Sequence, residues 1–195
     1  MSDYAVPFEK LRNTDVSSVG GKNASLGEMI SQLQAKGVRV PTGFATTANA
    51  FKEFLLHDNL GKKIEAELSG LDIDDVTSLA QSGKKIREWI SKTPFPKALE
   101  QAIDFEYKSL ASKSADGTAF AVRSSDTEED LPDAAVAGQQ ESVINIQGVD
   151  NIKQAIKEVY ASLYNDRAIS YQGHEGSIRN NVKIAACIQQ MVRSE

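Results

Sequence analysis

The chain has 195 residues, with 22 Lys and Arg against 27 Asp and Glu, and a formal net charge of −5. This acidic balance excludes a general nucleic-acid-binding protein, which needs a basic face, and no apolar run has the length of a membrane span. The single cysteine, Cys187, cannot form an intrachain disulfide, and the N-terminus has no secretory signal pattern, so we expect a cytoplasmic protein.

Helical patterns dominate the first two thirds of the chain. One helix is predicted by apolar residues at the spacing i, i+3, i+4 and i+7, namely Leu26, Met29, Ile30 and Leu33. Gly37 is expected to end this helix. Short extended segments are expected at 38–40 and 44–46, and Thr46 or Thr47 is expected to cap a second helix over 50–55.

From residue 60 to residue 112 the sequence predicts a small helical bundle. Its apolar residues follow helical spacing in two segments, which Pro94 and Pro96 separate. Such a segment is typical of a scaffold rather than of a site.

The pattern changes near Gly117. Strands are predicted at 119–123, 142–146 and 182–191, and a helix between the last two carries an apolar face of Ile152, Ile156, Val159 and Leu163. In the last strand the face with Cys187 and Gln189 is mixed in polarity, which predicts a strand that packs on one side and lines a cleft on the other. These strands, together with the helix-rich first part, predict an α+β (mixed α/β) fold.

The most informative segment is 120–142, FAVRSSDTEEDLPDAAVAGQQES. Arg123 can bind phosphate oxygens through two parallel donors, and Gly138 lets a backbone approach a ligand closely because it has no Cβ. Ser124, Ser125 and Ser142 offer hydroxyl donors. This order of strand, arginine, hydroxyls and glycine loop indicates a polyphosphate site.

A second candidate is Lys22, which follows two glycines and precedes the first long helix. An ammonium group at a helix N-terminus favours an anion, although the surrounding residues do not match the P-loop spacing. The local sequence leaves alternatives open for both cations. Lys22 could be an exposed lysine in a turn, and Arg123 could pair with an acid at position 126, 129 or 130.

Three motifs in the same order resemble the phosphoenolpyruvate synthase (pyruvate, water dikinase) family. They are VGGKNASLGEM at 19–29, VPTGFATT at 40–47, and RSS, EDLPD and AGQQ between 123 and 140. The resemblance runs in register from about residue 4 to residue 193. It identifies residues 1–195 as the N-terminal portion of an ATP-grasp-type nucleotide-binding domain.

The resemblance implies a reaction for the parent enzyme, assigned to gluconeogenesis. ATP, pyruvate and water become AMP, phosphoenolpyruvate and phosphate by way of a phosphohistidine. The second ATP-grasp half, the phosphohistidine domain and the barrel that binds pyruvate and phosphoenolpyruvate are expected outside this chain. The portion itself is expected to bind ATP weakly at most and to turn over nothing.

The resemblance also implies roles for five residues. It places the family's ATP-binding lysine on Lys22 and its phosphate-contacting, catalytic arginine on Arg123. Gly138 and Ser142 fall in the loop over the triphosphate, where Ser142 keeps the hydroxyl that related enzymes often carry as threonine. Gln189 is expected at the adenine edge, on a par with the alternative of a polar residue on an open strand face.

The resemblance places the Mg²⁺ ligands outside this chain. The acids between 126 and 133 are therefore expected to cap turns, to pair with cations or to be solvated. His57, at an expected helix end, and His174, in an expected loop, lack the surroundings of the family's phosphocarrier histidine. We interpret both as surface residues.

Two other interpretations remain. The rifampicin phosphotransferase family shares the Arg-Ser-Ser and Ala-Gly-Gln-Gln motifs, although the segments 19–29 and 40–47 favour the synthase, and pyruvate, phosphate dikinase is more distant. A short non-catalytic protein that binds nucleotide or a partner chain is a hypothesis from another class.

Overall fold

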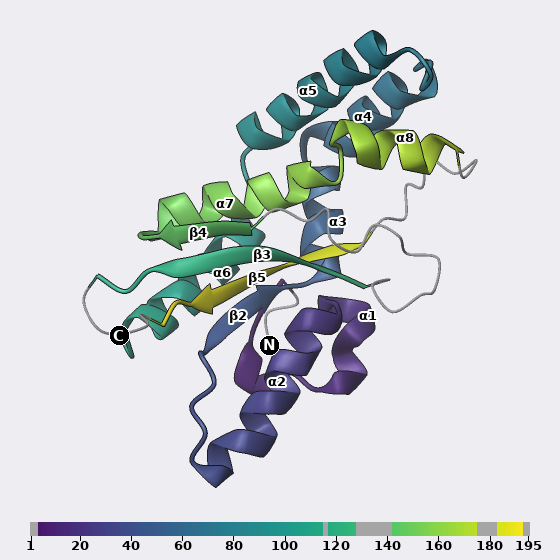
Figure 1. The fold of residues 1–195 in the computed structure, drawn as a ribbon. Coiled ribbons are helices and arrows are strands. Elements are labelled where there is room, and N and C mark those ends of the chain that lie inside the picture. Colours follow the sequence, from purple (N-terminus) through teal and green to yellow (C-terminus); the bar gives the residue numbers. More distant parts are fainter. Residues whose placement is uncertain (1–3, 115–116, 128–141, 175–182, 193–195) are drawn as a thin grey trace.

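A five-stranded antiparallel sheet with helices on both faces forms the centre of the fold (Figure 1). The computed structural model describes residues 4–114, 117–127, 142–174 and 183–192. The strands lie in the order β1-β2-β5-β3-β4 and are β1 (Ala5–Pro7), β2 (Gly43–Thr46), β3 (Phe120–Asp126), β4 (Ser142–Ile146) and β5 (Ile184–Gln190). The helices are α1 (Val16–Val19), α2 (Gly21–Leu33), α3 (Ala48–Leu56), α4 (Leu60–Ser69), α5 (Val76–Lys92), α6 (Lys97–Ala111), α7 (Val149–Ser162) and α8 (Asp166–His174). The predicted α+β class is confirmed.

Short 3₁₀ segments join several of these elements. They are η1 (Phe8–Lys10), η2 (Asn13–Asp15), η3 (Gln34–Lys36) and η4 (His57–Asn59). Gly37 follows η3 with a φ of 78°, so it ends the first long helical stretch as predicted. Thr47 caps α3, because its side chain accepts a hydrogen bond from the Ala50 amide at 3.1 Å.

The central strand β5 pairs with β2 on one side and with β3 on the other. Residues 184–188 of β5 are buried on both faces, so the predicted open side of this strand is covered except near Gln189. β3 continues three residues beyond its predicted end, because Ser124, Ser125 and Asp126 pair with β5. Arg123 therefore lies inside a strand and not at its end.

One face of the sheet packs against α3, α6 and α7 and holds the larger apolar core. Phe51, Phe54, Phe95 and Tyr160 form a ring cluster there, with centroid distances from 4.8 to 6.5 Å. The predicted bundle over 60–112 is only partly correct. α4 and α5 pack as a pair, whereas α6 leaves them after Pro94 and Pro96 and packs on β1 and β2.

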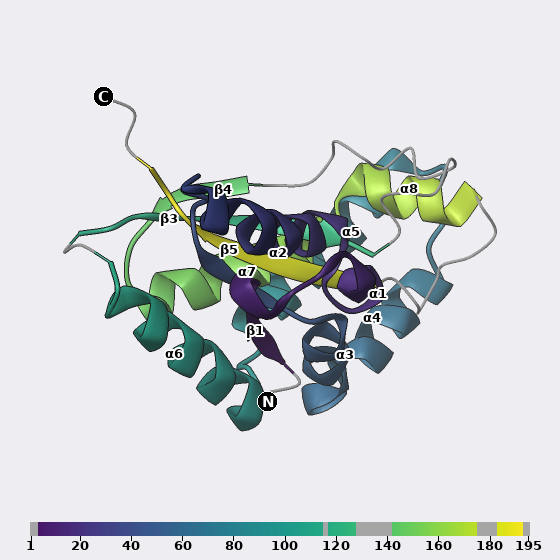
Figure 2. The same ribbon diagram turned by 90° about the horizontal axis from the view of Figure 1, so that it is seen from below.

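The other face is covered by α1 and α2, which lie across β5 and β3 (Figure 2). The predicted apolar stripe of α2 is only partly correct. The buried positions are Asn23, Ala24, Gly27 and Ile30, and Met29 is 41% exposed. Gly27 has no side chain, so the backbone of Leu11 packs directly against the helix and the small residues turn inward.

The helix predicted from Ile152 onward is α7, and α8 follows it and packs against α5. His174 is the last residue of α8, so its predicted place in a loop is wrong. Within the described ranges, no helix combines the length and apolar character needed to cross a membrane.

Candidate functional site

Strand pairing places three of the predicted site residues on the side of the sheet that faces α2. Arg123 in β3 lies directly opposite Ser142 in β4 and opposite Cys187 in β5. Directly paired residues point to the same side of a sheet, and every second residue of a strand shares that side. Gln189, two residues after Cys187, therefore lies on the same face as Arg123 and Ser142.

Helix α2 brings Lys22 to this face from a distant part of the sequence. Lys22 lies in the first turn of α2, and its Nζ donates to the Ser124 backbone carbonyl at 3.4 Å. Burial raises the pKa of the Cys187 thiol to about 12, and the positive charges of Arg123 and Lys22 oppose part of that rise. Both cations thus lie within electrostatic reach of the same buried sulfur.

Arg123 is exposed although its strand neighbours are buried. Within the described part of the chain its guanidinium makes no ion pair, so the alternative of a pair with Asp126 is not observed there. Glu129, Asp130 and Gly138 lie outside the described residues. The exposed Arg123 guanidinium and the Ser142 hydroxyl lie on one sheet face, where both can donate hydrogen bonds to an anion.

The hydroxyls of Ser124 and Ser125 do not share the role expected of them. Ser124 is fully buried on the opposite face, where its Oγ has no hydrogen-bond partner among the described residues, so the expectation for Ser124 is wrong. Ser125 is fully buried beneath α2, and its Oγ accepts from the Asn23 backbone amide at 3.3 Å. Local sequence patterns do not predict this contact, and its only signal is a glycine at the start of the helix.

Gln189 lies at the partly open end of β5. Its side-chain Nε2 donates to the Pro41 carbonyl at 3.3 Å, and its neighbour Gln190 pairs with Phe120 and so points to the other face. Gln189, and not its neighbour Gln190, therefore lies on the α2 side of the sheet.

The sequence predicts neither a metal site nor a phosphocarrier histidine in this chain. Across residues 4–114, 117–127, 142–174 and 183–192, no three His, Cys, Asp or Glu side chains are grouped so that they could hold a metal ion. Of the acids between 126 and 133, only Asp126 is described. His57 begins η4 and its Nε2 lies 3.7 Å from Asp58, away from the strands that carry Arg123.

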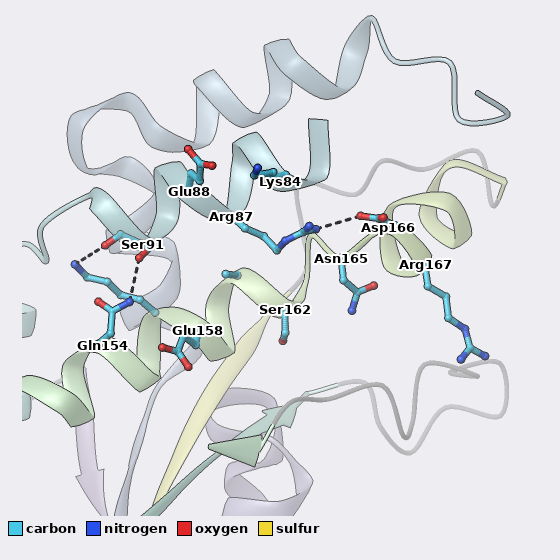
Figure 3. Close-up of a pocket in the computed structure, with 12 residues that line it drawn as sticks. Lys84, Arg87, Glu88, Ser91, Gln154, Glu158, Ser162, Asn165, Asp166 and Arg167 are labelled. Atoms are coloured by element: carbon cyan, nitrogen blue, oxygen red, sulfur yellow. Dashed lines mark hydrogen bonds and ion pairs between the residues drawn. The ribbon is translucent and has the colours of Figure 1, made fainter. Parts of the chain in front are cut away.

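A cavity of about 890 Å³ lies on the other side of the sheet, between α5, α7 and α8 (Figure 3). Some of its charged side chains make hydrogen bonds or ion pairs within the fold. Arg87 donates to the Tyr164 carbonyl at 2.7 Å and to Asp166 at 3.2 Å, and Lys157 donates to the Ser91 carbonyl at 3.3 Å. None of the predicted site residues lines this cavity, and its internal pairs join α5 to α7 and α8.

Comparison with known proteins places this chain in a family. A family profile described as pyruvate phosphate dikinase, AMP/ATP-binding domain, matches residues 16–195. Phosphoenolpyruvate synthases of Neisseria meningitidis serogroup B and Pseudomonas aeruginosa are 56% identical over 194 residues and 53% identical over 195 residues, or 99% and 100% of this chain. That of Escherichia coli K12 is 52% identical over 188 residues, or 96% of this chain. In each case the chain spans 24% of the relative's length, and the matches confirm the family expected from the motifs.

Proposed function

Because the chain belongs to the pyruvate phosphate dikinase AMP/ATP-binding domain family, we propose that it binds the triphosphate of ATP on the α2 side of its sheet. Lys22 and Arg123 contact phosphate oxygens, Ser142 donates its hydroxyl, and the backbone at Gly138 covers the phosphates. Gln189 lies toward the adenine. Strand register supports this assignment for Arg123, Ser142 and Gln189, which lie on one face of the described sheet.

The observation that carries the proposal is the convergence of two cations from distant segments. Lys22 reaches the β3 backbone over a sequence separation of 102 residues, and Arg123 lies next to that contact on β3. An anion bound beside both groups is attracted by each of these positive charges. The N-terminus of α2 adds the partial positive charge at the end of the helix dipole.

In the longer enzyme we propose the reaction of phosphoenolpyruvate synthase, in which ATP, pyruvate and water give AMP, phosphoenolpyruvate and phosphate. In this scheme the chain holds Mg²⁺-ATP in the cytoplasm and presents its β-phosphoryl group to a histidine of another domain. Phosphoryl transfer depends mainly on positioning and on neutralising charge, and Lys22 and Arg123 supply both. Magnesium, when bound, supplies further charge neutralisation, and its protein ligands lie beyond the residues described.

The test is to remove each cation and to measure ATP binding by the chain. We expect Lys22→Met and Arg123→Ala each to weaken ATP affinity by about 10- to 100-fold, because a charge-assisted hydrogen bond contributes about 1.5–3 kcal/mol. Titration of ¹⁵N-labelled protein is suited to the weak affinity expected of the chain alone. In the longer enzyme, Arg123→Ala should abolish AMP formation.

Matched controls are available at the far end of the same helical segment. Lys36 and Arg39 are exposed and lie at and beyond the end of η3, so Lys36→Met and Arg39→Ala remove the same charges away from the site. We expect these controls to change ATP affinity less than about 2-fold, the effect of distant screened charges. Equal losses in the controls and the site variants would contradict the proposal.

A further inference from the structure

The first turn of α2 lacks the side-chain cap that most helices have. Its N-cap residue is Gly20, with a φ of 80° and no side-chain hydrogen bond. The first amides of a helix have no partner within the helix, and a Ser, Thr, Asp or Asn at the N-cap usually accepts from one of them. Here the amide of Asn23, the third residue of α2, donates to the Ser125 hydroxyl at 3.3 Å.

Ser125 thus supplies from strand β3 the acceptor that Gly20 cannot supply from the helix. A side chain at Gly20 would also collide with Ser125, because a Cβ built there lies 2.6 Å from the Ser125 carbonyl carbon. Glycine at the N-cap and serine on the strand therefore fit each other across a sequence separation of more than 100 residues. The contact is fully buried at both ends, since Asn23 and Ser125 are each 0% exposed.

This contact joins the two elements that carry the cations of the proposed ATP site. Lys22 immediately precedes Asn23 in the helix, and Arg123 lies two residues before Ser125 on the same face of β3. The position of the helix on the strand therefore sets the separation of the ammonium and guanidinium groups. The Asn23 side chain adds a second constraint, because its Nδ2 donates to the Val19 carbonyl at 2.7 Å and joins α2 to α1.

We propose that Ser125 is a positioning residue for nucleotide binding, which caps α2 from the neighbouring strand and holds Lys22 at the distance from Arg123 that a polyphosphate requires. The inference rests on the proposed function, because it assigns Ser125 a role that acts through Lys22. Ser125 itself does not contact the nucleotide.

The test combines Ser125→Ala with Lys22→Met in a double-mutant cycle on ATP affinity. Ser125→Ala alone should weaken ATP binding by about 3- to 10-fold, the range expected for the loss of one cap. In the Lys22→Met background the same change should weaken binding less than about 2-fold, because the group that Ser125 positions is already absent. Hydrogen exchange of the Asn23 amide should become faster in Ser125→Ala.

Ser124→Ala is the matched control. It deletes the same hydroxyl from the adjacent residue of the same strand, but the Ser124 Oγ lies on the opposite face and has no hydrogen-bond partner in the part of the chain that the structure describes. The carbonyl of Ser124 that accepts from Lys22 is retained. We expect ATP affinity and the exchange of the Asn23 amide to be unchanged in this variant.

The outcomes separate this inference from the proposed function. If Lys22→Met weakens ATP binding but Ser125→Ala does not, the positioning role is overturned and the proposed function stands. Equal effects of Ser125→Ala in both backgrounds would also overturn it, because the residue would then act on general stability. If Lys22→Met has no effect on ATP binding, both the proposed function and this inference fall.

Discussion

The two faces of the sheet differ in the size and composition of the apolar clusters that they bury. The face toward α3, α6 and α7 buries a large cluster with rings from Phe51, Phe54, Phe95 and Tyr160. The face toward α1 and α2 buries a much smaller cluster, which is Phe8, Leu11, Val19, Ala24, Ile30, Ala45 and Cys187. The second face also carries the exposed Arg123 and Ser142, together with Lys22.

This difference indicates that one face mainly stabilises the fold and the other mainly positions groups for a ligand. Stability grows with the apolar area that a fold buries, so the ring-rich face contributes most of it. On the α2 face, glycines and small side chains bring the backbone of the helix close to the strands, and the polar groups beside it remain accessible to a ligand. Precise placement of a few backbone contacts matters more there than buried area.

The largest effect should come from the ring-rich face. Phe54 is fully buried, and its ring lies 5.2 Å from that of Phe95 and 5.7 Å from that of Tyr160. We expect Phe54→Ala to lower the free energy of unfolding by about 3–5 kcal/mol, because it removes a large buried side chain and leaves a cavity. Urea denaturation followed by circular dichroism measures this loss.

The control for Phe54→Ala lies on α2. Met29 is 41% exposed, so Met29→Ala should change the free energy of unfolding by less than about 0.5 kcal/mol. A comparable loss in both variants would show that the outer side of α2 belongs to a core, and the contrast between the two faces would fail.

A smaller effect on stability, with a larger effect on ligand binding, is expected at Gly20. The variant Gly20→Ala places a methyl group against the Ser125 backbone and forces a non-glycine residue to a φ of 80°. We expect a loss of about 2 kcal/mol in the free energy of unfolding, within the usual range for such strain. ATP affinity should fall as well, because α2 must move away from β3.

Gly148 provides a matched control for this substitution. It is also the N-cap of a helix, its φ is 83°, and apart from its two chain neighbours no described residue has an atom within 4 Å of a Cβ built on it. Gly148→Ala therefore carries similar backbone strain without the steric contact. The difference between the two variants in thermal denaturation and ATP titration measures the effect of the steric contact with Ser125. Equal effects of the two variants would contradict a close contact between Gly20 and Ser125.

Much of the fold could be predicted from the sequence because local patterns agree with it. The cap at Thr47, the helix end at Gly37, the strand over 142–146 and the helix that carries Ile152, Ile156 and Val159 all follow from short-range rules. The inward face of α2 could not be predicted this way. It is set by the close approach of Leu11 to Gly27, a tertiary contact that leaves no periodic apolar signal.

The site was predictable in part, for a different reason. Lys22, Arg123, Ser142 and Gln189 were expected from motifs, and strand register places the last three on one face. Their roles in ATP binding stay predictions. The burial of Ser124 and the cap formed by Ser125 were not predictable, because alternation along β3 shows its orientation only once its partners and the position of α2 are known.

The smallest expected effect concerns a carboxylate beside the large core. Glu106 in α6 is 9% exposed, and burial raises its pKa, while Lys10 and Lys113 lower it and Glu9 raises it further. A raised pKa in the folded state means that the unfolded chain releases its proton first as the pH rises. The stability contribution of Glu106 is therefore most favourable at acid pH and is lost as the pH rises from about 4.5 through the folded-state pKa.

The variant Glu106→Gln removes this pH dependence. We expect it to gain stability relative to the parent between about pH 4 and pH 8, by about 1 kcal/mol or less. Urea denaturation at a series of pH values measures the difference, with Glu158→Gln as the control because Glu158 is exposed on α7. If both variants follow the parent curve at every pH, burial of the Glu106 carboxylate does not weaken the ring-rich face, contrary to the raised pKa.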